Sequence, residues 1–329
     1  MIDTTHPDVA LALKVVRQGA DMAQQVLTGM AAKNLTKSDF SPVTVGDFAS
    51  QALAAHAMLA VTPNVPLVGE ECADELRTEE GAEMRALIAE FVAKVIPEAT
   101  EDSVCEWIDY GNAEPGDRFW TLDPIDGTKG YLRGGQYAVA FALIENGQVE
   151  VGALGCPNLG ENCETDMGKG ITIIAKRGEG AWISVADGPF TQLKVSECDN
   201  IALARVMRSV EDSHTNSGQI DAIDEILGVK AEPVRMDSQA KYAVLASGGG
   251  ELLFRLLNPG REDYRECIWD QAAGAIVLEE AGGRITDLQG RTLDFSQGRK
   301  LMKNTGVFAS NGKLHDAGLA AIAQVCKFD

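Results

Sequence analysis

The chain has 329 residues, of which 45% are hydrophobic and 24% charged, a composition typical of a globular protein with a sizeable core. Its 29 Lys and Arg residues are outnumbered by 49 Asp and Glu residues, which gives a formal net charge of −20. This charge repels nucleic-acid polymers and anionic lipid, so neither is an expected partner. The seven cysteines are dispersed without a C-x-x-C pair, and we find no signal or membrane-spanning segment. We therefore expect a cytoplasmic protein without a zinc site.

Three helices and one short strand are expected in the first third of the chain. Apolar residues recur at helical spacing behind Pro7, which favours the start of a helix. A polar turn at residues 37–42 separates the first helix from the second. The expected helices span residues 8–32, 48–60 and 78–95, and the strand Leu67-Val68 ends at Gly69-Glu70-Glu71.

The middle of the chain has the pattern of an antiparallel sheet. Runs of β-type residues follow one another with short turns, at residues 119–122, 137–144, 149–155, 171–175 and 181–185. Strands then alternate with predicted helices over residues 217–227, 238–246, 269–281 and 315–326. We therefore expect an N-terminal α+β domain over residues 1–190 and a C-terminal α/β domain over residues 191–329.

Two carboxylates and a hydroxyl come together in the segment Trp120-Thr121-Leu122-Asp123-Pro124-Ile125-Asp126-Gly127-Thr128. An apolar strand leads into Asp123, Pro124 favours an extended backbone, and Gly127-Thr128 begins a turn or helix. A carboxylate pair at the end of a strand suits Mg²⁺, which binds oxygen ligands and keeps water or substrate in its other positions. The alternative is a capped turn, because Asp, Pro and Gly are common turn residues.

Further acidic positions fit the same chemistry, but each also has a purely structural interpretation. Glu70 and Glu71 follow the short strand, where a pair of glutamates is commonly a solvated turn. Asp270 opens a predicted helix and Asp47 precedes another, and aspartate at such positions is commonly a cap. None of these positions identifies a site by itself.

Taken together, these positions resemble a known family. Asp47 with the preceding Ser41-Pro42-Val43-Thr44, Gly69-Glu70-Glu71, Asp123 to Thr128 and Trp269-Asp270 occur in the order of the lithium-sensitive, Mg²⁺-dependent phosphatase superfamily. That superfamily contains inositol monophosphatases and bisphosphate nucleotidases. The resemblance implies a layered αβαβα sandwich, classed as α+β or α/β, of the inositol monophosphatase and fructose-1,6-bisphosphatase type.

Three strings are similar to the 3′(2′),5′-bisphosphate nucleotidases within this superfamily. They are the segment from Asp123 to Gly134, Gly155-Cys156-Pro157-Asn158-Leu159, and Asp237-Ser238-Gln239-Ala240-Lys241-Tyr242. The likeness extends from about Lys37 to about Ser310 and so covers most of the chain.

The resemblance implies a centre with at least two Mg²⁺ ions. Glu70, Asp123 and the Ile125 carbonyl would bind one ion. Asp123, Asp126 and Asp270 would bind the second, so that Asp123 bridges the pair. Two cations about 3.5–4 Å apart stabilise both the attacking and the leaving oxygen of a phosphoryl displacement.

The resemblance also implies roles for the residues around the ions. Asp47 and Thr128 would orient and deprotonate the attacking water, and Glu71 would support the ligands. Backbone N–H groups of Gly127, Thr128 and Lys129 would face the phosphate at the start of a helix.

A basic set in the second half would bind the nucleotide and its other phosphate. The resemblance places His214, Ser238, Lys241 and Arg255 there, although isolated basic residues are commonly just solvated. The implied reaction converts adenosine 3′,5′-bisphosphate and water into AMP and phosphate. The sulfated analogue of this nucleotide and inositol 1,4-bisphosphate are possible secondary substrates.

Three other functions remain open at this point. An inositol phosphate phosphatase would have the same metals and fold, but the Asp237 to Tyr242 string and the length of the chain count against it. A phosphatase with an aspartyl-phosphate intermediate uses D-x-D, whereas this chain has D-x-x-D at Asp123 and Asp126. An acidic binding or scaffold protein would use its carboxylates only to solvate the surface.

Overall fold

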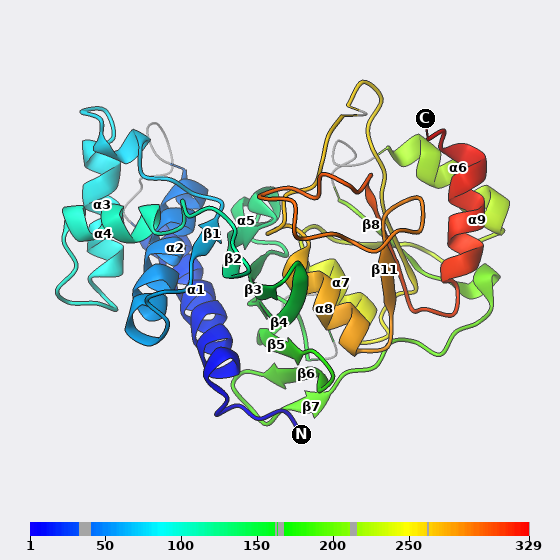
Figure 1. Ribbon diagram of the computed structural model, residues 1–329, viewed down its shortest axis with the longest axis horizontal. Coiled ribbons are helices and arrows are strands. Elements are labelled where there is room, and N and C mark those ends of the chain that lie inside the picture. The colour runs from blue at the N-terminus through cyan, green and yellow to red at the C-terminus, as the bar shows by residue number, and fades with distance from the viewer. Residues whose placement is uncertain (33–40, 162, 164–167, 211–215, 262, 329) are drawn as a thin grey trace.

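The computed structural model describes residues 1–32, 41–161, 163, 168–210, 216–261 and 263–328. Its helices and sheets are stacked in layers along the long axis of the molecule (Figure 1). The order is a helical layer, a seven-stranded sheet, a second helical layer, a five-stranded sheet and an outer helical layer. The αβαβα sandwich expected from the sequence is confirmed.

The seven-stranded sheet follows the chain order of its strands. Its strands are β1 (Leu67–Gly69), β2 (Arg118–Asp126), β3 (Ala138–Glu145), β4 (Gln148–Cys156), β5 (Ile171–Lys176), β6 (Gly180–Val185) and β7 (Thr191–Gln192). β1 pairs with β2 in parallel, and every later pair is antiparallel, as the short turns predict. Strand β2 continues beyond Leu122 as far as Asp126, so it carries both aspartates of the central motif.

One face of this sheet is covered by α1 (Pro7–Ala32) and α2 (Pro42–Val61). Buried side chains of both helices pack on the stacked rings of Trp120 and Phe141, whose centroids lie 4.3 Å apart. Next to α2 lie η1 (Glu75–Arg77), α3 (Ala82–Val92) and α4 (Glu101–Asp109), which form a separate lobe at the left of Figure 1.

The opposite face is covered by α7 (Ala240–Ala246) and α8 (Ala272–Glu280). Every residue from Ala272 to Leu278 is buried, because α8 lies between the two sheets. The second sheet has the order β11 (Arg284–Thr286), β12 (Val307–Ser310), β10 (Leu252–Arg255), β8 (Val206–Arg208) and β9 (Val234–Arg235). Helices α6 (Ser217–Leu227) and α9 (His315–Val325) cover its outer face.

The two halves of the chain share one hydrophobic core, since α8 from the second half packs on strands of the first sheet. The first sheet also continues to β7, just beyond residue 190. The division into two domains at that position stays a prediction.

Two helices differ from the expectation. Helix α2 begins at Pro42 rather than at residue 48, because proline suits the first position of a helix. Asp47 therefore lies inside the helix, and its interpretation as a cap is wrong. Helix α4 was not expected, although Thr100 and Ser103 form a reciprocal capping box that marks its start.

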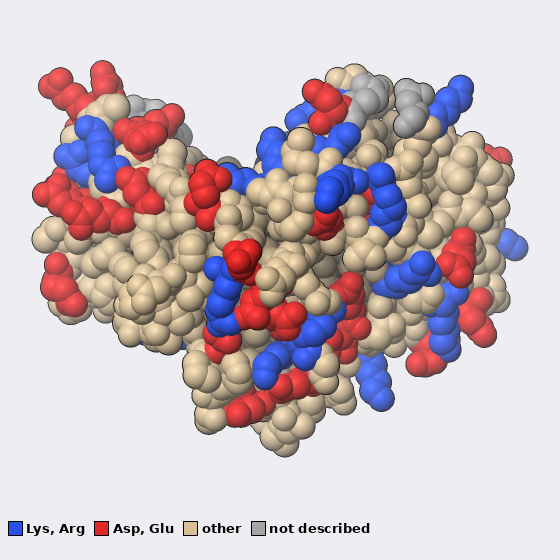
Figure 2. All heavy atoms as spheres, viewed as in Figure 1, with Lys and Arg blue, Asp and Glu red and all other residues tan. Residues whose placement is uncertain are grey.

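Acidic side chains gather over the lobe formed by α3 and α4 (Figure 2). With η1 and its cap, this lobe carries ten exposed carboxylates, on Asp74, Glu75, Glu79, Glu80, Glu83, Glu90, Glu98, Glu101, Asp102 and Glu106. Among the described residues, no helix has both the length and the apolar character needed to cross a membrane.

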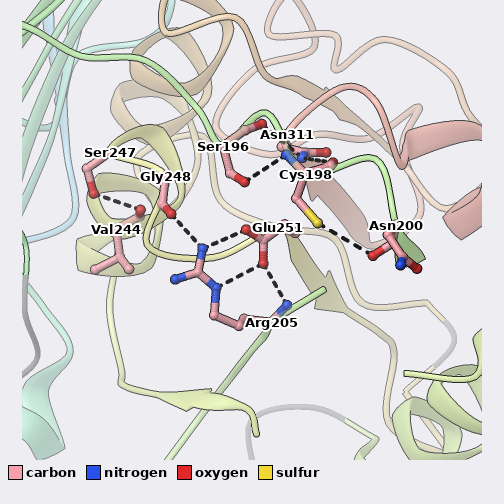
Figure 3. Close-up of polar contacts among 9 residues, drawn as sticks. All are labelled: Ser196, Cys198, Asn200, Arg205, Val244, Ser247, Gly248, Glu251 and Asn311. Carbon is pink, nitrogen blue, oxygen red and sulfur yellow. Dashed lines mark hydrogen bonds and ion pairs between the residues drawn. The ribbon is translucent and has the colours of Figure 1, made fainter. Parts of the chain in front are cut away.

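The connection from the first sheet to the second is fixed by an ion pair whose acidic partner, Glu251, is buried. Glu251 lies at the start of β10 with a side chain that is 2% exposed, and it accepts hydrogen bonds from the Arg205 guanidinium and the Arg205 backbone N–H (Figure 3). Arg205 also donates to the Gly248 carbonyl at 2.6 Å. Asn311 donates to the carbonyls of Ser196 and Cys198, upstream in the same connection. These contacts anchor residues 196–205 to the second sheet.

We expect Glu251→Gln to lower the free energy of unfolding by about 1.5–3 kcal/mol, because it weakens several hydrogen bonds between charged groups in a buried setting. Urea unfolding at pH 7 measures this loss. The control is Asp316→Asn, which disrupts the exposed pair of Arg284 with Asp316 and should change stability by less than about 0.5 kcal/mol. Equal losses in the two variants would contradict the role assigned to Glu251.

Candidate active site

The central motif leaves the first sheet at an interruption of its hydrogen-bond ladder. The pairing of β2 with β3 shifts register between Asp123 and Asp126, around Pro124, which has no N–H to donate. Gly127 then takes a left-handed conformation with φ of 91°, and helix α5 (Thr128–Leu132) begins. A Cβ atom at Gly127 would stand 2.7 Å from the Ser238 Cβ, so glycine allows two loops from different halves of the chain to meet.

The predicted metal ligands converge on one cavity of about 400 Å³. Glu70 reaches it because Gly69 pairs with Leu122, which places the end of β1 beside Asp123. Asp270 reaches it from the turn before α8 and makes no cap, since the preceding position of that helix is Gln271. Glu70, Asp123, Ile125, Asp126 and Asp270 all line the cavity.

Asp123 is the most constrained of these carboxyl groups. It is 2% exposed, and its buried Oδ1 atom has no hydrogen-bond partner. Burial raises its pKa well above the usual range, and the charges of Glu70, Asp126 and Asp270 raise it further. A buried acceptor without a donor, beside other carboxylates, is the environment that a bound cation would complete.

The neighbouring acids are perturbed in the same direction. Burial raises the pKa of Asp126 and, more strongly, of Asp270, while the Arg255 guanidinium opposes both shifts. Glu70 is exposed at the rim, yet the surrounding protein and the charge of Asp126 still raise its pKa. Keeping these carboxyl groups anionic at neutral pH therefore lowers the free energy of unfolding.

Asp47 and Glu71 lie next to this group. Burial raises the pKa of Asp47 well above its usual value, and the charges of Glu71 and Glu70 add to the shift. Burial and the charge of Glu70 raise the pKa of Glu71 to about 7. Asp47 also acts electrostatically on Asp123, so α2 brings a proton acceptor near the cluster.

The loop that carries Glu70 and Glu71 is held by a fully buried glutamine of α2. Gln51 donates to the carbonyls of Glu71 and Ile108 and accepts from the Glu71 N–H. A Cβ atom at Gly69 would stand 2.4 Å from Gln51 Oε1, so this approach requires glycine there. Sequence reasoning did not single out Gln51, since a glutamine on an apolar helix face has no distinctive motif.

Gln239 connects the carboxylates of the two halves. Its backbone N–H donates to Asp126 Oδ2 at 2.5 Å, and its side-chain amide donates to the Trp269 carbonyl at 2.9 Å. Its Oε1 accepts from the Gly274 N–H in α8. The Asp237 to Tyr242 string was recognised in the sequence, but only the structure reveals that its glutamine positions both Asp126 and the residue before Asp270.

The predicted nucleotide-binding residues line the same cavity, with one exception. Ser238, Lys241 and Arg255 line it, together with Ser209 and Tyr264. Burial and the neighbouring Arg255 lower the pKa of Lys241 to about 8, and its Nζ donates to Ser209 Oγ at 3.2 Å. Arg255 donates to Glu266 at 2.7 Å. His214 falls outside the described residues.

The start of α5 lines the same cavity as these two sets of residues. Gly127, Thr128 and Lys129 all line the cavity, as expected from the sequence. Thr128 is exposed and belongs to the lining of the cavity.

The donor set fits a hard divalent cation. Among the described residues no three acidic, histidine or cysteine side chains already stand as a preformed metal site. However, the converging groups are all oxygen donors of the kind that Mg²⁺ binds, and Asp123 presents an unsatisfied buried oxygen. Such a cation would also relieve the repulsion that raises these pKa values.

Comparison with known proteins identifies the family that this fold and cleft define. The profile of the inositol monophosphatase family matches residues 5–327, and the chain belongs to that family. Members of the family are metal-dependent phosphatases.

Individual proteins of known name are also similar to this chain. The chain is 38% identical to a 3′(2′),5′-bisphosphate nucleotidase of Emericella nidulans, over 96% of this chain and 97% of the relative. It is 39% identical to the enzyme of that name from Schizosaccharomyces pombe, over 97% and 96% of the two chains. An inositol monophosphatase structure from Anabaena (Nostoc) sp. PCC 7120 superposes with a TM-score of 0.63 at 19% identity, over 98% of both chains, which confirms the fold.

We expect Asp123→Asn to stabilise the metal-free protein at pH 8. Because folding raises the pKa of Asp123, this group lowers the free energy of unfolding at pH values above its unfolded value of 3.8, and the loss grows with pH until the folded pKa is passed. The gain should be about 1 kcal/mol or more at pH 8 and smaller at pH 5. Urea unfolding in EDTA at both values measures it, with the exposed Asp199→Asn as control. A variant less stable than the wild type at both values would contradict the assigned repulsion.

Proposed function

We propose that this chain is a Mg²⁺-dependent 3′(2′),5′-bisphosphate nucleotidase that hydrolyses the 3′-phosphate of adenosine 3′,5′-bisphosphate to give AMP and phosphate. The observation that carries the proposal is the buried, unpartnered Asp123 oxygen among carboxylates, in a cavity that Lys241 and Arg255 also line. The names of the relatives at 38% and 39% identity support the choice of substrate.

Five groups would hold the metal. Glu70, Asp123 and the Ile125 carbonyl would bind one Mg²⁺, and Asp123, Asp126 and Asp270 a second. When bound, Mg²⁺ supplies positive charge that stabilises the attacking and leaving oxygens of the displacement. The Gln239 N–H and the Gln51 amide keep these loops in place before any ion binds.

Asp47 and Thr128 would act on the attacking water. Burial raises the pKa of the Asp47 carboxyl, and a more basic carboxylate is a better proton acceptor. The Thr128 hydroxyl would orient the water, and Glu71 would support the loop that carries Glu70. Backbone N–H groups at the start of α5 would bind the oxygens of the phosphate that is cleaved.

Lys241 and Arg255, with Ser238, would hold the phosphate that is not cleaved. Charge-assisted hydrogen bonds from these cations would position the nucleotide and favour a bisphosphate over a monophosphate. The positive charges of Lys241 and Arg255 would also attract the phosphate locally, although the whole chain has a net charge of −20. The sulfated nucleotide and inositol 1,4-bisphosphate would be secondary substrates. None of the seven cysteines, all of which the structure describes, forms a disulfide, which supports a reducing compartment such as the cytoplasm.

A second candidate is an inositol phosphate phosphatase. The family profile and the solved structures at 16–20% identity favour it, because they bear that name or share that fold. Comparing phosphate release from adenosine 3′,5′-bisphosphate, its 2′,5′ isomer, inositol 1-phosphate and inositol 1,4-bisphosphate, with and without Mg²⁺, tests the two. A scaffold role is disfavoured, since the carboxylates of the cleft are desolvated rather than used as surface charge.

We expect Asp123→Asn and Asp270→Asn to lose at least 90% of the Mg²⁺-dependent activity while remaining folded. Each change removes an anionic oxygen from a site with few protein ligands. Phosphate release at saturating Mg²⁺ and circular dichroism measure the two effects, with Asp199→Asn as control. Retention of more than about a tenth of the wild-type rate, equivalent to 1.4 kcal/mol of barrier, by Asp123→Asn would refute the shared-ligand assignment.

We expect Lys241→Met to lower kcat/KM for adenosine 3′,5′-bisphosphate, with a loss of transition-state stabilisation of about 1.5–3 kcal/mol. The kcat/KM for 3′-AMP should fall much less. The reason is that 3′-AMP lacks the phosphate that Lys241 would bind. Arg255→Ala should act in the same direction, although it also leaves Glu266 without its partner. Lys194→Met, at an exposed lysine, is the control. If Lys241→Met slows both substrates by the same factor, the residue serves the common phosphate or the fold instead.

A further inference from the structure

Arg299 joins the two loops that deliver Glu70 and Asp270. It belongs to the segment between β11 and β12, which no motif in the sequence marks as part of the site. Its guanidinium donates to the Gly69 carbonyl, directly before Glu70, and its Cζ lies 4.9 Å from the centre of the Trp269 ring, directly before Asp270. One side chain therefore contacts the neighbours of both carboxylates.

The Arg299 backbone holds the same place. Its carbonyl accepts from the Ile268 N–H at 3.1 Å, and the backbone of Lys300 pairs with that of Cys267 in an isolated antiparallel β-bridge. The Leu301 N–H donates to the Glu266 carbonyl at 2.9 Å. The segment at Arg299 thus runs alongside the residues that lead into Asp270, while the side chain also contacts the end of β1.

The geometry on the β1 side uses the flat shape of the guanidinium. A second Arg299 nitrogen lies 3.5 Å from the Ala113 carbonyl, and Ala113 itself donates to Leu67 in β1. The two terminal nitrogens of the guanidinium therefore contact two carbonyls while its Cζ lies over the Trp269 ring. A lysine can supply the charge but cannot make the two edge contacts and the stacking contact together.

We propose that Arg299 is a positioning residue that couples Glu70 and Asp270, so that the carboxylates from the two halves of the chain bind metal as one site. The inference rests on the proposed function for the identity of the metal. Arg299 lies outside the described lining of the cavity, so it acts through the positions of the two loops and not by contact with substrate.

The test measures metal binding directly. Mn²⁺ is added to the wild type, Arg299→Met, Arg299→Lys and Arg284→Met, and the free ion is followed by electron paramagnetic resonance. Arg284 provides a matched control, because it is an arginine of the same half whose partner is the exposed Asp316. We expect Arg299→Met to raise the Mn²⁺ dissociation constant about tenfold, as loss of a group that orients metal ligands does, and Arg299→Lys about threefold.

Steady-state kinetics supply an independent readout. The Mg²⁺ concentration for half-maximal phosphate release should rise in the same proportion in both Arg299 variants. The KM for adenosine 3′,5′-bisphosphate at saturating Mg²⁺ should change less than twofold, because the side-chain contacts of Arg299 are with Gly69, Ala113 and Trp269 and not with Ser238 or Lys241. A purely structural defect would instead lower thermal stability and affect both constants.

Each outcome decides a different question. If both Arg299 variants bind Mn²⁺ as the wild type does, or if Arg284→Met loses binding equally, the inference is wrong and the proposed function stands. If the wild type itself binds no Mn²⁺ and is not activated by Mg²⁺, the proposed metal-dependent function fails and the inference with it. If Arg299→Met does not fold, Arg299→Lys alone carries the test.

Discussion

Mutual repulsion among carboxylates in one cleft is the constraint that the surrounding structure has to satisfy. Asp123 is buried among Glu70, Asp126, Asp270 and Asp47, and each of these charges raises its pKa. Like charges at short range would separate if their loops were free to move. Neutral amides and one guanidinium hold the loops instead. Gln51 binds the backbone of Glu71, Gln239 binds Asp126 and the Trp269 carbonyl, and Arg299 links Gly69 to Trp269.

The two halves of the chain approach each other closely at the cavity, and we call this contact the seam. The loop after β2 and the segment Asp237–Gln239 meet through the Gly127 and Ser238 backbones, both with positive φ. Arg133 at the end of α5 pairs with Asp237 at 2.7 Å on the same seam. Ser238 is not a glycine, so its φ of 69° stores strain that the surrounding contacts must offset. Strain at this point places Ser238 against the cavity, where the second phosphate would bind.

The cationic side of the cavity is tied to the core rather than to the surface. Arg255 pairs with Glu266, whose carboxylate also accepts from Gln271, and Gln271 in turn accepts from the Tyr242 hydroxyl at 2.5 Å. This network fixes the guanidinium without consuming all of its donors. Substrate would therefore meet a cation that is already oriented, and binding energy would not be spent on ordering it.

The spacing of apolar residues is enough to predict β1 to β6 of the first sheet, α1 and the α/β pattern of the second half, whereas β7, at the polar residues Thr191–Gln192, has no such pattern. The sequence by itself also determined the metal-ligand candidates Glu70, Asp123, Asp126 and Asp270, because their motifs resemble those of one family. It did not reveal α4, the true start of α2, or the roles of Gln51, Gln239 and Arg299. Amides and a guanidinium that bind backbone groups far along the chain leave no local pattern. Their partners become neighbours only when the two sheets pack on α8, so the tertiary structure alone decides which of them hold the site together.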